Sequence, residues 1–246
     1  MEKVALITGS SGGIGLALCQ TFKNADYLII GLDKVKGNDK FSDRFIEADL
    51  RKMCSNEVYC SQILQQIRNY LSDKNLEVLV NNAAIQIVKP TEEITLDDWH
   101  QTLDINLIAP FILTQALLSE LEKTCGSVVN IASIHANLTK PGFICYATSK
   151  TGLVGLTKSM AVELGSRVRI NAICPAAVAT PMLVEGFKGK EELLDLLSSI
   201  HPVGRIAKPE EVAEAALFLA SPQAKFINGA SLELDGGIKS RLYDPV

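Results

Sequence analysis

The sequence lacks the features of a membrane or secreted protein. No apolar run reaches the roughly 18 residues of a membrane-spanning helix, and the chain starts in a strand-like segment rather than in a signal peptide. Low-complexity tracts and internal repeats are also lacking, although 47% of the 246 residues are hydrophobic. We therefore expect a cytoplasmic protein in which residues 1–246 form one large α/β domain.

Patterns that bind metals or nucleic acids are absent as well. The six cysteines include no C-x-x-C pair, and His100, His135 and His201 share no ligand spacing, so neither disulfides nor a metal site is expected. The net charge is −4 and no basic patch is present, which argues against a nucleic-acid partner. The function has to be sought in other motifs.

A glycine-rich segment stands between an apolar run and a helix-like pattern. Val4–Ile7 is continuously apolar, as is typical of a parallel strand with both faces covered. Thr8–Gly15, with the sequence TGSSGGIG, follows at once. A glycine turn between a buried strand and a helix N-terminus lets backbone amides and the helix dipole meet a diphosphate. A tight turn that binds nothing is the alternative interpretation.

The second apolar run, Tyr27–Leu32, ends in Asp33, twenty residues after Gly13. A carboxylate at this place grips the adenosine ribose hydroxyls of NAD and repels the extra phosphate of NADP. Lys34 and Lys36 weaken this argument, because a lysine there could receive that phosphate. We predict NAD, with NADP as the alternative cofactor.

The remaining apolar patterns predict further strands and helices. Only about ten residues separate the second strand from the third, so a short loop is expected there instead of a crossover helix. The expected strands are Phe45–Ala48, Val78–Val80, Val128–Ile131, Val168–Cys174 and Ser231–Leu234. The expected helical regions are Met53–Tyr70, Ile94–Leu121 with a bend at Pro110, a segment from Tyr146 to Leu164, and one that opens at Pro209.

Tyr146 and Lys150 stand four residues apart, which on a helix puts both side chains on one face. A phenol has a pKa near ~10, and a nearby ammonium lowers it, so the pair suits a general acid/base that acts on an alcohol or carbonyl oxygen. Ser133, at the end of a strand, is placed to hydrogen-bond the same oxygen. Tyr70 and Lys74 share this spacing, but their polar surroundings indicate a solvated helix end.

The substrate side is less defined. His135 lies two residues after Ser133 and is expected either to hydrogen-bond a polar substrate or to face water as a loop residue. Residues 176–200, with two short helical pieces, are typical of a movable lid, and residues 238–246 form a tail. The other candidate pocket walls, some of which belong equally well to the core, are Gln86, Ile87, Phe143, Val178, Met182 and Phe187.

Several spaced motifs together resemble the single-domain short-chain dehydrogenase/reductase family. They are Thr8-Gly9-x-x-x-Gly13-x-Gly15, Asn81-Asn82-Ala83, Asn106, Ser133, Tyr146-x-x-x-Lys150 and Pro175…Thr180-Pro181-Met182, and they span Lys3 to Gly237. The resemblance implies a Rossmann-type, doubly wound parallel sheet of about seven strands with helices on both faces. Two positions depart from the family pattern, because Ala84 and Ala176 stand where glycine is usual.

The resemblance also implies roles for single residues. Tyr146 would be the acid/base, Ser133 would hold the substrate oxygen, Lys150 would bind the nicotinamide ribose, and Asn106 would place a proton-relaying water. The substrate would be bound by Ser133, His135 and Tyr146. The cofactor would be bound by Gly9, Ser11, Gly13, Ile14, Gly15, Asp33, Asp49, Leu50, Asn82, Ala83, Ala84, Tyr146, Lys150, Pro175, Val178 and Thr180.

We therefore expect an NAD-dependent oxidoreductase that interconverts a secondary alcohol and a ketone. Two alternatives stay open: an NADP-dependent 3-oxoacyl-type reductase, and an NAD-binding sensor or scaffold without catalysis. Sugars, hydroxy acids and sterols all suit the mixed polar and apolar candidate walls. Family resemblance further implies a homotetramer that pairs through the helical regions Ile94–Leu121 and Ile144–Leu164 and through the last strand.

Overall fold

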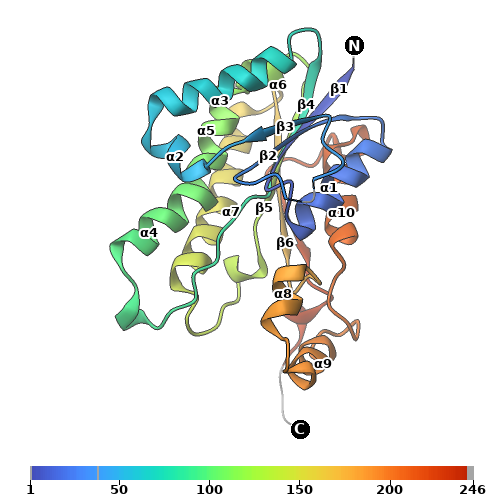
Figure 1. Cartoon of the computed structure of the whole chain (residues 1–246). Helices are drawn as coiled ribbons and strands as arrows, with labels where there is room; N and C mark the ends of the chain where they lie inside the picture. The colour runs from blue at the N-terminus through green and yellow to red at the C-terminus, as the bar shows by residue number, and fades with distance from the viewer. Residues whose placement is uncertain (1, 38, 243–246) are drawn as a thin grey trace.

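One sheet of seven parallel strands organises the protein (Figure 1). The computed structural model describes residues 2–37 and 39–242, except for the side chain of Met182, so that candidate wall and residues 243–246 of the predicted tail lie outside it. The strand order β3-β2-β1-β4-β5-β6-β7 confirms the predicted fold. The strands are β1 Lys3–Thr8, β2 Leu28–Asp33, β3 Arg44–Glu47, β4 Asn75–Asn81, β5 Ser127–Ile131, β6 Arg169–Pro175 and β7 Ser231–Leu234.

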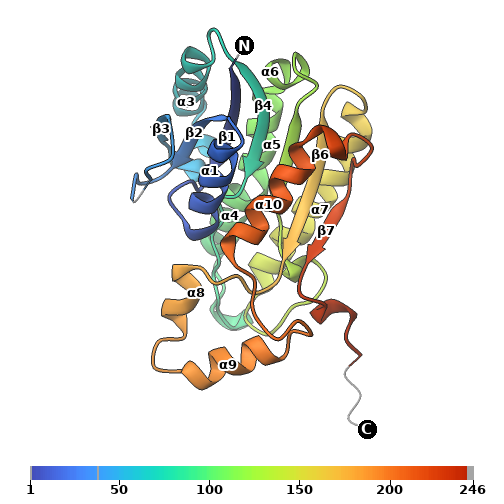
Figure 2. The ribbon, with the colours of Figure 1, turned by 90° about the vertical axis from the view of Figure 1, so that its right-hand side faces the viewer.

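Helices cover both faces of the sheet. On one face α1 and α10 pack side by side, and on the other lie α3, α5 and α7 (Figures 1 and 2). The helices are α1 Gly13–Asn24, α2 Leu50–Ser55, α3 Glu57–Tyr70, α4 Leu96–Leu103, α5 Ala109–Ala116, α6 Leu118–Glu122, α7 Ile144–Leu164, α8 Pro181–Gly186, α9 Glu191–Ser199 and α10 Pro209–Ala220.

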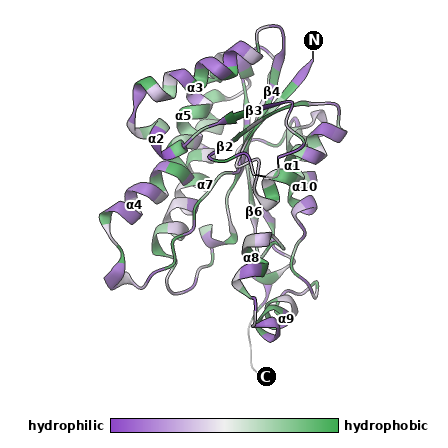
Figure 3. Ribbon diagram, in the orientation of Figure 1, coloured by the Kyte–Doolittle hydropathy of each residue, from purple (hydrophilic) through white to green (hydrophobic). Residues whose placement is uncertain are grey.

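The two apolar layers between sheet and helices explain the continuous apolar runs. Val4, Leu6 and Ile7 of β1 are 0% exposed, because each successive side chain points into one layer or the other. Full burial of such a side chain stabilises the fold by about 1.5–3 kcal/mol. Figure 3 shows the apolar residues concentrated on the central strands and polar residues on the outer turns of α3 and α4. No helix in the described part of the chain has the length and hydrophobicity of a membrane crossing.

The predicted helix Met53–Tyr70 is wrong in one respect, because the structure breaks it. Asn56 is extended, with φ −139°, and separates α2 from α3. Its side chain accepts a hydrogen bond from the Tyr59 amide and so caps the start of α3. The break turns the chain at the edge of the sheet, between the end of β3 and α3.

The bend in the predicted region Ile94–Leu121 also differs. The turn Asp104–Ile108 (η2) has π-helical geometry and lies before Pro110, which falls in the first turn of α5. Proline has no N–H to donate to the carbonyl four residues earlier, that of Asn106. The wide turn therefore sits around Asn106 rather than at the proline, and a second break follows at Leu117.

Arg169, at the start of β6, ties that strand to the end of α10. Its guanidinium donates five hydrogen bonds of 2.8 to 3.3 Å to backbone carbonyls, and burial lowers the pKa of the group. These bonds satisfy carbonyls that a helix end leaves without partners. The acceptors are Leu219, Ala220, Ser221, Ala224 and Ile227.

The predicted irregular stretch with two short helical pieces is confirmed. Residues 176–200, the α8–α9 segment, lie beyond the carboxyl ends of the strands (Figure 2). No side chain of α9 is buried, and Leu193 and Leu196 are more than half exposed. The predicted short loop between β2 and β3 is confirmed too, since the described residues between Asp33 and Arg44, all but residue 38, form no helix.

Candidate active site

The four predicted catalytic residues gather at the carboxyl ends of β4, β5 and β6. Ser133 follows β5 and begins a short 3-10 turn, Tyr146 and Lys150 lie in the first two turns of α7, and Asn106 lies in η2. The ammonium of Lys150 is 5.6 Å from the centre of the Tyr146 ring, as the helical spacing predicted. Lys150 is only 2% exposed, and its Nζ donates a 2.8 Å hydrogen bond to the Ile131 carbonyl.

The charges of this pair depart from the sequence expectation. Burial raises the pKa of the Tyr146 hydroxyl, and a hydrogen bond with the Ser133 side chain lowers it less. In the protein by itself Lys150 does not lower the pKa of Tyr146, because its ammonium bonds to the Ile131 carbonyl; the lowering by Lys150 stays a prediction for the site with its cofactor bound. Burial also lowers the pKa of Lys150 to about 8, so the lysine titrates close to neutral pH.

Asn106 is fully buried and is hydrogen-bonded both to α7 and to the segment that follows β4. Its side-chain amide donates to the Ile85 carbonyl at 2.9 Å and to Ser149 Oγ at 3.0 Å, and its oxygen accepts from the Ile85 amide at 2.9 Å. Ser149 Oγ in turn donates to the Tyr146 carbonyl at 2.7 Å. Sequence reasoning missed Ser149 as a link; its position three residues after Tyr146 on one helix was the available signal.

The glycine-rich loop has the shape that its sequence predicts. Gly9 has φ +66°, and a Cβ there would meet the Asn82 side chain at 2.8 Å and the Ala83 Cα at 2.9 Å. Asn82 Nδ2 donates to the Thr8 carbonyl at 2.9 Å and so holds the loop against the end of β4. A Cβ at Gly15 would lie 1.8 Å from the Gly9 carbonyl oxygen, so this close approach requires glycine.

The start of α1 is a fitting cradle for a dinucleotide phosphate. Gly12 is its N-cap, no side chain caps it, and its first turn holds no acidic residue. The first amides of a helix have no intrahelical partner and carry a partial positive charge, which favours an anion. The predicted cofactor residue Ile14 belongs to this first turn, where its side chain packs on the apolar layer under α1.

The predicted ribose and adenine positions lie side by side at the ends of β2 and β3. Asp33 accepts hydrogen bonds from the Ser11 amide at 2.9 Å and from the Lys34 amide at 2.7 Å. Asp49 is the N-cap of α2, and its carboxylate pairs with the Lys34 ammonium at 2.9 Å. The side chain of Leu50 is 7% exposed and belongs to the core, so only its backbone is placed to face a ligand.

The predicted nicotinamide positions follow β6. Pro175 ends the strand, Val178 is 7% exposed and forms a bridge with Ala207, and Thr180 caps α8 by accepting from the Leu183 amide at 3.2 Å. This start of α8 touches the glycine loop, because a Cβ at Gly13 would meet Pro181 Cδ at 2.9 Å.

The two alanines that replace family glycines cause no backbone strain. Among the residues that the structure describes, only Asp26 and Cys125 have a positive φ without being glycine. Ala84 and Ala176 therefore hold conformations open to any L-residue, and the effect of each is limited to one added methyl group.

An aromatic stack borders Tyr146. His135 stacks on Phe143 with ring centres 4.5 Å apart and planes at 8°, and it meets Tyr146 edge-on at 5.6 Å. Its Nδ1 lies 3.0 Å from Thr139 Oγ1. Burial, and then the positive charge of Lys140, lower the pKa of the imidazole, so the ring is neutral at pH 7.

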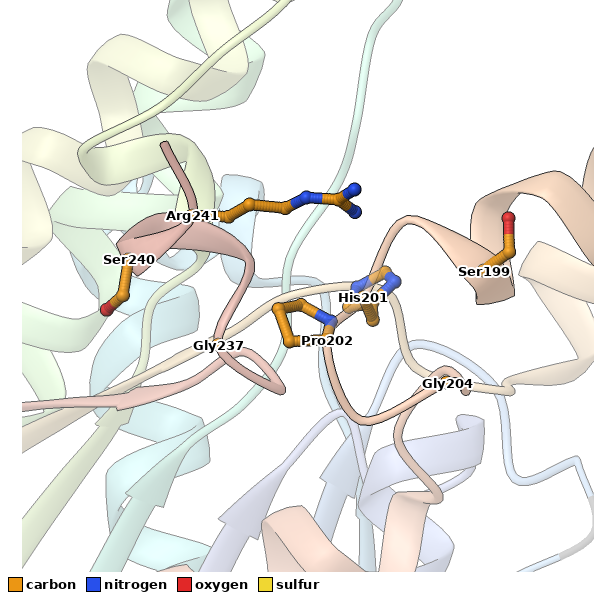
Figure 4. A pocket seen from close by; sticks show the side chains of 7 residues that line it. All are labelled: Ser199, His201, Pro202, Gly204, Gly237, Ser240 and Arg241. Atoms are coloured by element: carbon orange, nitrogen blue, oxygen red, sulfur yellow. The ribbon is translucent and has the colours of Figure 1, made fainter. Parts of the chain in front are cut away.

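Open volume lies next to the α8–α9 segment. A cavity of about 650 Å³ is formed where the end of α9 meets the turn after β7 (Figure 4). Its buried His201 holds the Leu197 carbonyl through Nδ1 at 2.7 Å. The lining residues are Ser199, His201, Pro202, Gly204, Gly237, Ser240 and Arg241.

Comparison with known sequences connects this geometry to dehydrogenases and reductases. The profile of a family described as enoyl-(acyl carrier protein) reductase matches residues 9–239. The D-threitol dehydrogenase of Mycolicibacterium smegmatis is 35% identical over 96% of this chain and 92% of its own. The acetoacetyl-CoA reductase of an Acinetobacter strain is 30% identical over 96% of this chain and 98% of its own.

Solved structures agree with the sequence comparison. The aldohexose dehydrogenase of Thermoplasma acidophilum superposes with a TM-score of 0.91 at 31% identity, over 100% of this chain and 97% of its own. A 4-hydroxyisoleucine dehydrogenase complexed with NADH has a TM-score of 0.87 at 28% identity, over 98% of this chain and 100% of its own. An NADP-bound protein of Beutenbergia cavernae, described as a putative gluconate 5-dehydrogenase, has a TM-score of 0.86 at 28% identity, over 98% and 97%.

Proposed function

Since the chain belongs to the short-chain dehydrogenase/reductase family, we propose that it is an NAD-dependent oxidoreductase that interconverts a secondary alcohol and a ketone. The observation that carries the proposal is the joint placement of Ser133, Tyr146, Lys150 and Asn106 beside an uncapped helix start that suits a diphosphate. NAD, when bound, supplies the acceptor or donor of the hydride.

In this proposal the side chains manage one proton and hold the substrate oxygen. Tyr146 takes the proton from the alcohol or returns it to the ketone, and Ser133, its hydrogen-bond partner, holds the same oxygen. Lys150 binds the nicotinamide ribose and supplies the positive charge beside the phenol. Asn106, rigidly held by Ile85 and Ser149, positions a water that relays the proton outward.

The remaining cofactor contacts follow from the positions at the strand ends. The glycine loop and the amides at the start of α1 hold the diphosphate, and Asp33 accepts from the ribose hydroxyls. Asp49 and the Leu50 backbone border the adenine, and Asn82, Ala83 and Ala84 line the crevice at the end of β4. Pro175, Val178 and Thr180 contact the nicotinamide end. NADP is the weaker candidate because the Asp33 carboxylate repels a phosphate.

The substrate we propose is a small polyhydroxylated compound, such as a sugar or a sugar alcohol. The neutral imidazole of His135 lies beside Tyr146 and is able to hydrogen-bond a hydroxyl near the reacting carbon. The names of the relatives, which act on D-threitol and aldohexose, support the same class. The α8–α9 segment is proposed as the lid over this substrate, with residues 238–242 as its neighbour.

The direct test is turnover by the purified protein with NAD across sugars, hydroxy acids and sterols, followed as reduced nicotinamide. Tyr146→Phe should lower turnover by about 100-fold or more while the affinity for NADH stays unchanged. Tyr70→Phe is the matched control, because this second tyrosine with a lysine four residues later lies far along α3, and its turnover should equal the wild type. Near-wild-type turnover of Tyr146→Phe would refute the assignment.

A second candidate function is that of an acyl reductase. The matching family profile carries an enoyl-(acyl carrier protein) reductase description, and one relative is an acetoacetyl-CoA reductase. This function predicts turnover of a short 3-oxoacyl thioester with reduced nicotinamide, and none of the polyol panel. NADH binding without turnover of any alcohol or ketone would instead favour a sensor or scaffold.

We further propose a homotetramer in the cytoplasm. Large apolar side chains stay exposed on η2, α5 and α7, among them Phe111, Ile144 and Val162, which is 84% exposed. Helices exposed in this way are suited to pack against a second copy. The six described cysteines are all unpaired, as is usual in a reducing compartment. Sedimentation equilibrium at micromolar concentration tests the assembly, and a monomer would refute it.

A further inference from the structure

Two opposite charges follow one another at the end of β2, and the structure separates their roles. Asp33 turns toward the glycine loop, where the Ser11 amide donates to it at 2.9 Å. The next residue, Lys34, stands at a sequence position from which its ammonium could bind the phosphate on the ribose of NADP. Whether the aspartate or the lysine decides the preference between NAD and NADP therefore depends on where the Lys34 ammonium lies.

The Lys34 side chain reaches across to the end of β3. Its Nζ lies 2.9 Å from Asp49 Oδ2. The other carboxylate oxygen of Asp49 accepts from the Arg51 amide at 3.0 Å and from the Lys52 amide at 3.3 Å, so the carboxylate is fixed at the start of α2. Burial alone would raise the pKa of Asp49, but the bonds from Lys34 and the two amides outweigh it and hold the pKa below its usual value.

The loop after β2 folds back onto the glycine-rich segment. Ser11 Oγ lies 2.9 Å from the Val35 carbonyl oxygen and 2.8 Å from the Lys36 carbonyl oxygen, and these two acceptors share its one hydroxyl proton. Gly37, with φ +48°, lets the loop turn back over Ser11. The ends of the adjacent strands β2 and β3 thus carry two fixed carboxylates, Asp33 and Asp49, and like charges there oppose a ribose phosphate dianion.

We propose that Asp49 is a second determinant of cofactor choice: it holds the Lys34 ammonium at the end of β3, so that the ammonium is not offered to the phosphate of NADP. The inference rests on the proposed function, in which a nicotinamide dinucleotide lies along the glycine loop. Asp33 repels the phosphate, and Asp49 withdraws the nearest cation from it. The Lys34 side chain is 74% exposed, so solvent screens the pair, and its effect on affinity is about fivefold at most.

A double-mutant cycle tests this division of roles. The dissociation constants of NADPH and NADH are measured by fluorescence titration for the wild type, Asp49→Asn, Lys34→Gln and the double variant. Asparagine caps a helix as well as aspartate does, so α2 should be kept, and equal melting temperatures check this. Binding is measured rather than turnover, because the readout must not depend on the catalytic proposal.

The expected result depends on the background. Asp49→Asn should tighten NADPH binding about three- to fivefold, and Lys34→Gln should reverse that gain in the double variant while changing NADPH affinity by less than about twofold in the wild type. Lys36→Gln removes the same charge two residues away and is the matched control, and its effect should be the same in both backgrounds.

Three results would overturn the inference alone, and a fourth would also refute the proposed function. If Lys34→Gln weakens NADPH binding threefold or more in the wild type, Lys34 already serves the phosphate. If the double variant binds NADPH as tightly as Asp49→Asn does, Lys34 does not contribute to NADPH affinity even when it is released from Asp49. Binding of neither nucleotide by any variant would refute the proposed function together with this inference, whereas NADH binding with a flat cycle refutes the inference alone.

Discussion

Helix α7 and the α8–α9 segment meet at the same end of the sheet, yet they are held in opposite ways. Helix α7 buries seven side chains, Lys150 and Ser149 among them, and its polar groups are bonded to β5 and to Asn106. Helix α9 buries none, and the segment is anchored mainly at its ends, where Pro181 packs on Gly13 and His201 holds the Leu197 carbonyl. The groups that we propose to move a proton are thus fixed, while the proposed lid has few contacts that would prevent it from adjusting.

The largest effect should come from removing the ammonium of α7. Lys150→Met keeps the volume but removes the charge beside Tyr146 and the bond to Ile131, so turnover should fall by about 100-fold or more. Lys190→Met makes the same change on the exposed start of α9, and its turnover should stay within about twofold of the wild type. Steady-state kinetics with a substrate from the panel of sugars, hydroxy acids and sterols measures both. Equal losses of turnover would contradict the idea that α7 and not the α8–α9 segment holds the proton-transferring groups.

Substitutions in α7 should also lower the free energy of unfolding more than substitutions in α9. Leu153 of α7 is 1% exposed and packs in the apolar cluster with Ala132 and Cys174, so Leu153→Ala should lower the free energy of unfolding by about 2–5 kcal/mol. Leu196 of α9 is 56% exposed, so Leu196→Ala should change it by less than about 0.5 kcal/mol while altering KM. Urea unfolding measures the difference. A comparable loss at Leu196 would show that α9 is part of the core.

A smaller effect should appear in the pH dependence of stability. Burial lowers the pKa of Lys150 from 10.5 to about 8, so between these values the unfolded chain binds more protons than the folded one. Raising the pH therefore stabilises the fold through this group. From pH 7 to about pH 9.5, the free energy of unfolding of the wild type relative to Lys150→Met should rise by about 2 kcal/mol.

The comparison with Lys150→Met is needed because other groups act in the opposite sense. Burial raises the pKa of Cys19 and Cys54 to about 12, so ionisation of these thiols in the unfolded chain destabilises the fold at high pH. They are present in both proteins and cancel in the difference. A difference that does not change with pH would mean that the lysine titrates normally and is not buried as described.

The structural features that depend on local sequence patterns could be predicted from the sequence. Continuous apolar runs mark the strands, because a parallel strand covered on both faces has no polar side to show, and the four-residue spacing places Tyr146 and Lys150 on one face of α7. The tight approach of Gly9 and Gly15 is likewise visible as a glycine motif. These features depend on neighbours in sequence.

Features that depend on partners distant in sequence could not be predicted. The wide turn at Asn106 depends on the Ile85 backbone, and the direction of the Lys150 ammonium depends on a carbonyl of β5. The pairing of Lys34 with Asp49 depends on β3 lying next to β2. The candidate cofactor and catalytic residues could therefore be chosen from sequence motifs. Their hydrogen bonds and pKa shifts could be described only from the structure.

The five bonds of Arg169 bear on the order in which the chain can fold during synthesis. The strand that carries this side chain is made 58 residues before the last carbonyl that it needs, that of Ile227. Until residues 219–227 have emerged from the ribosome, burying the guanidinium would leave some or all of its N–H groups without acceptors, so the strand should stay loose. Chains released before that point should therefore be cleaved by proteases within β6 itself and not only at their ragged end, and protection of β6 in such fragments would disprove the idea.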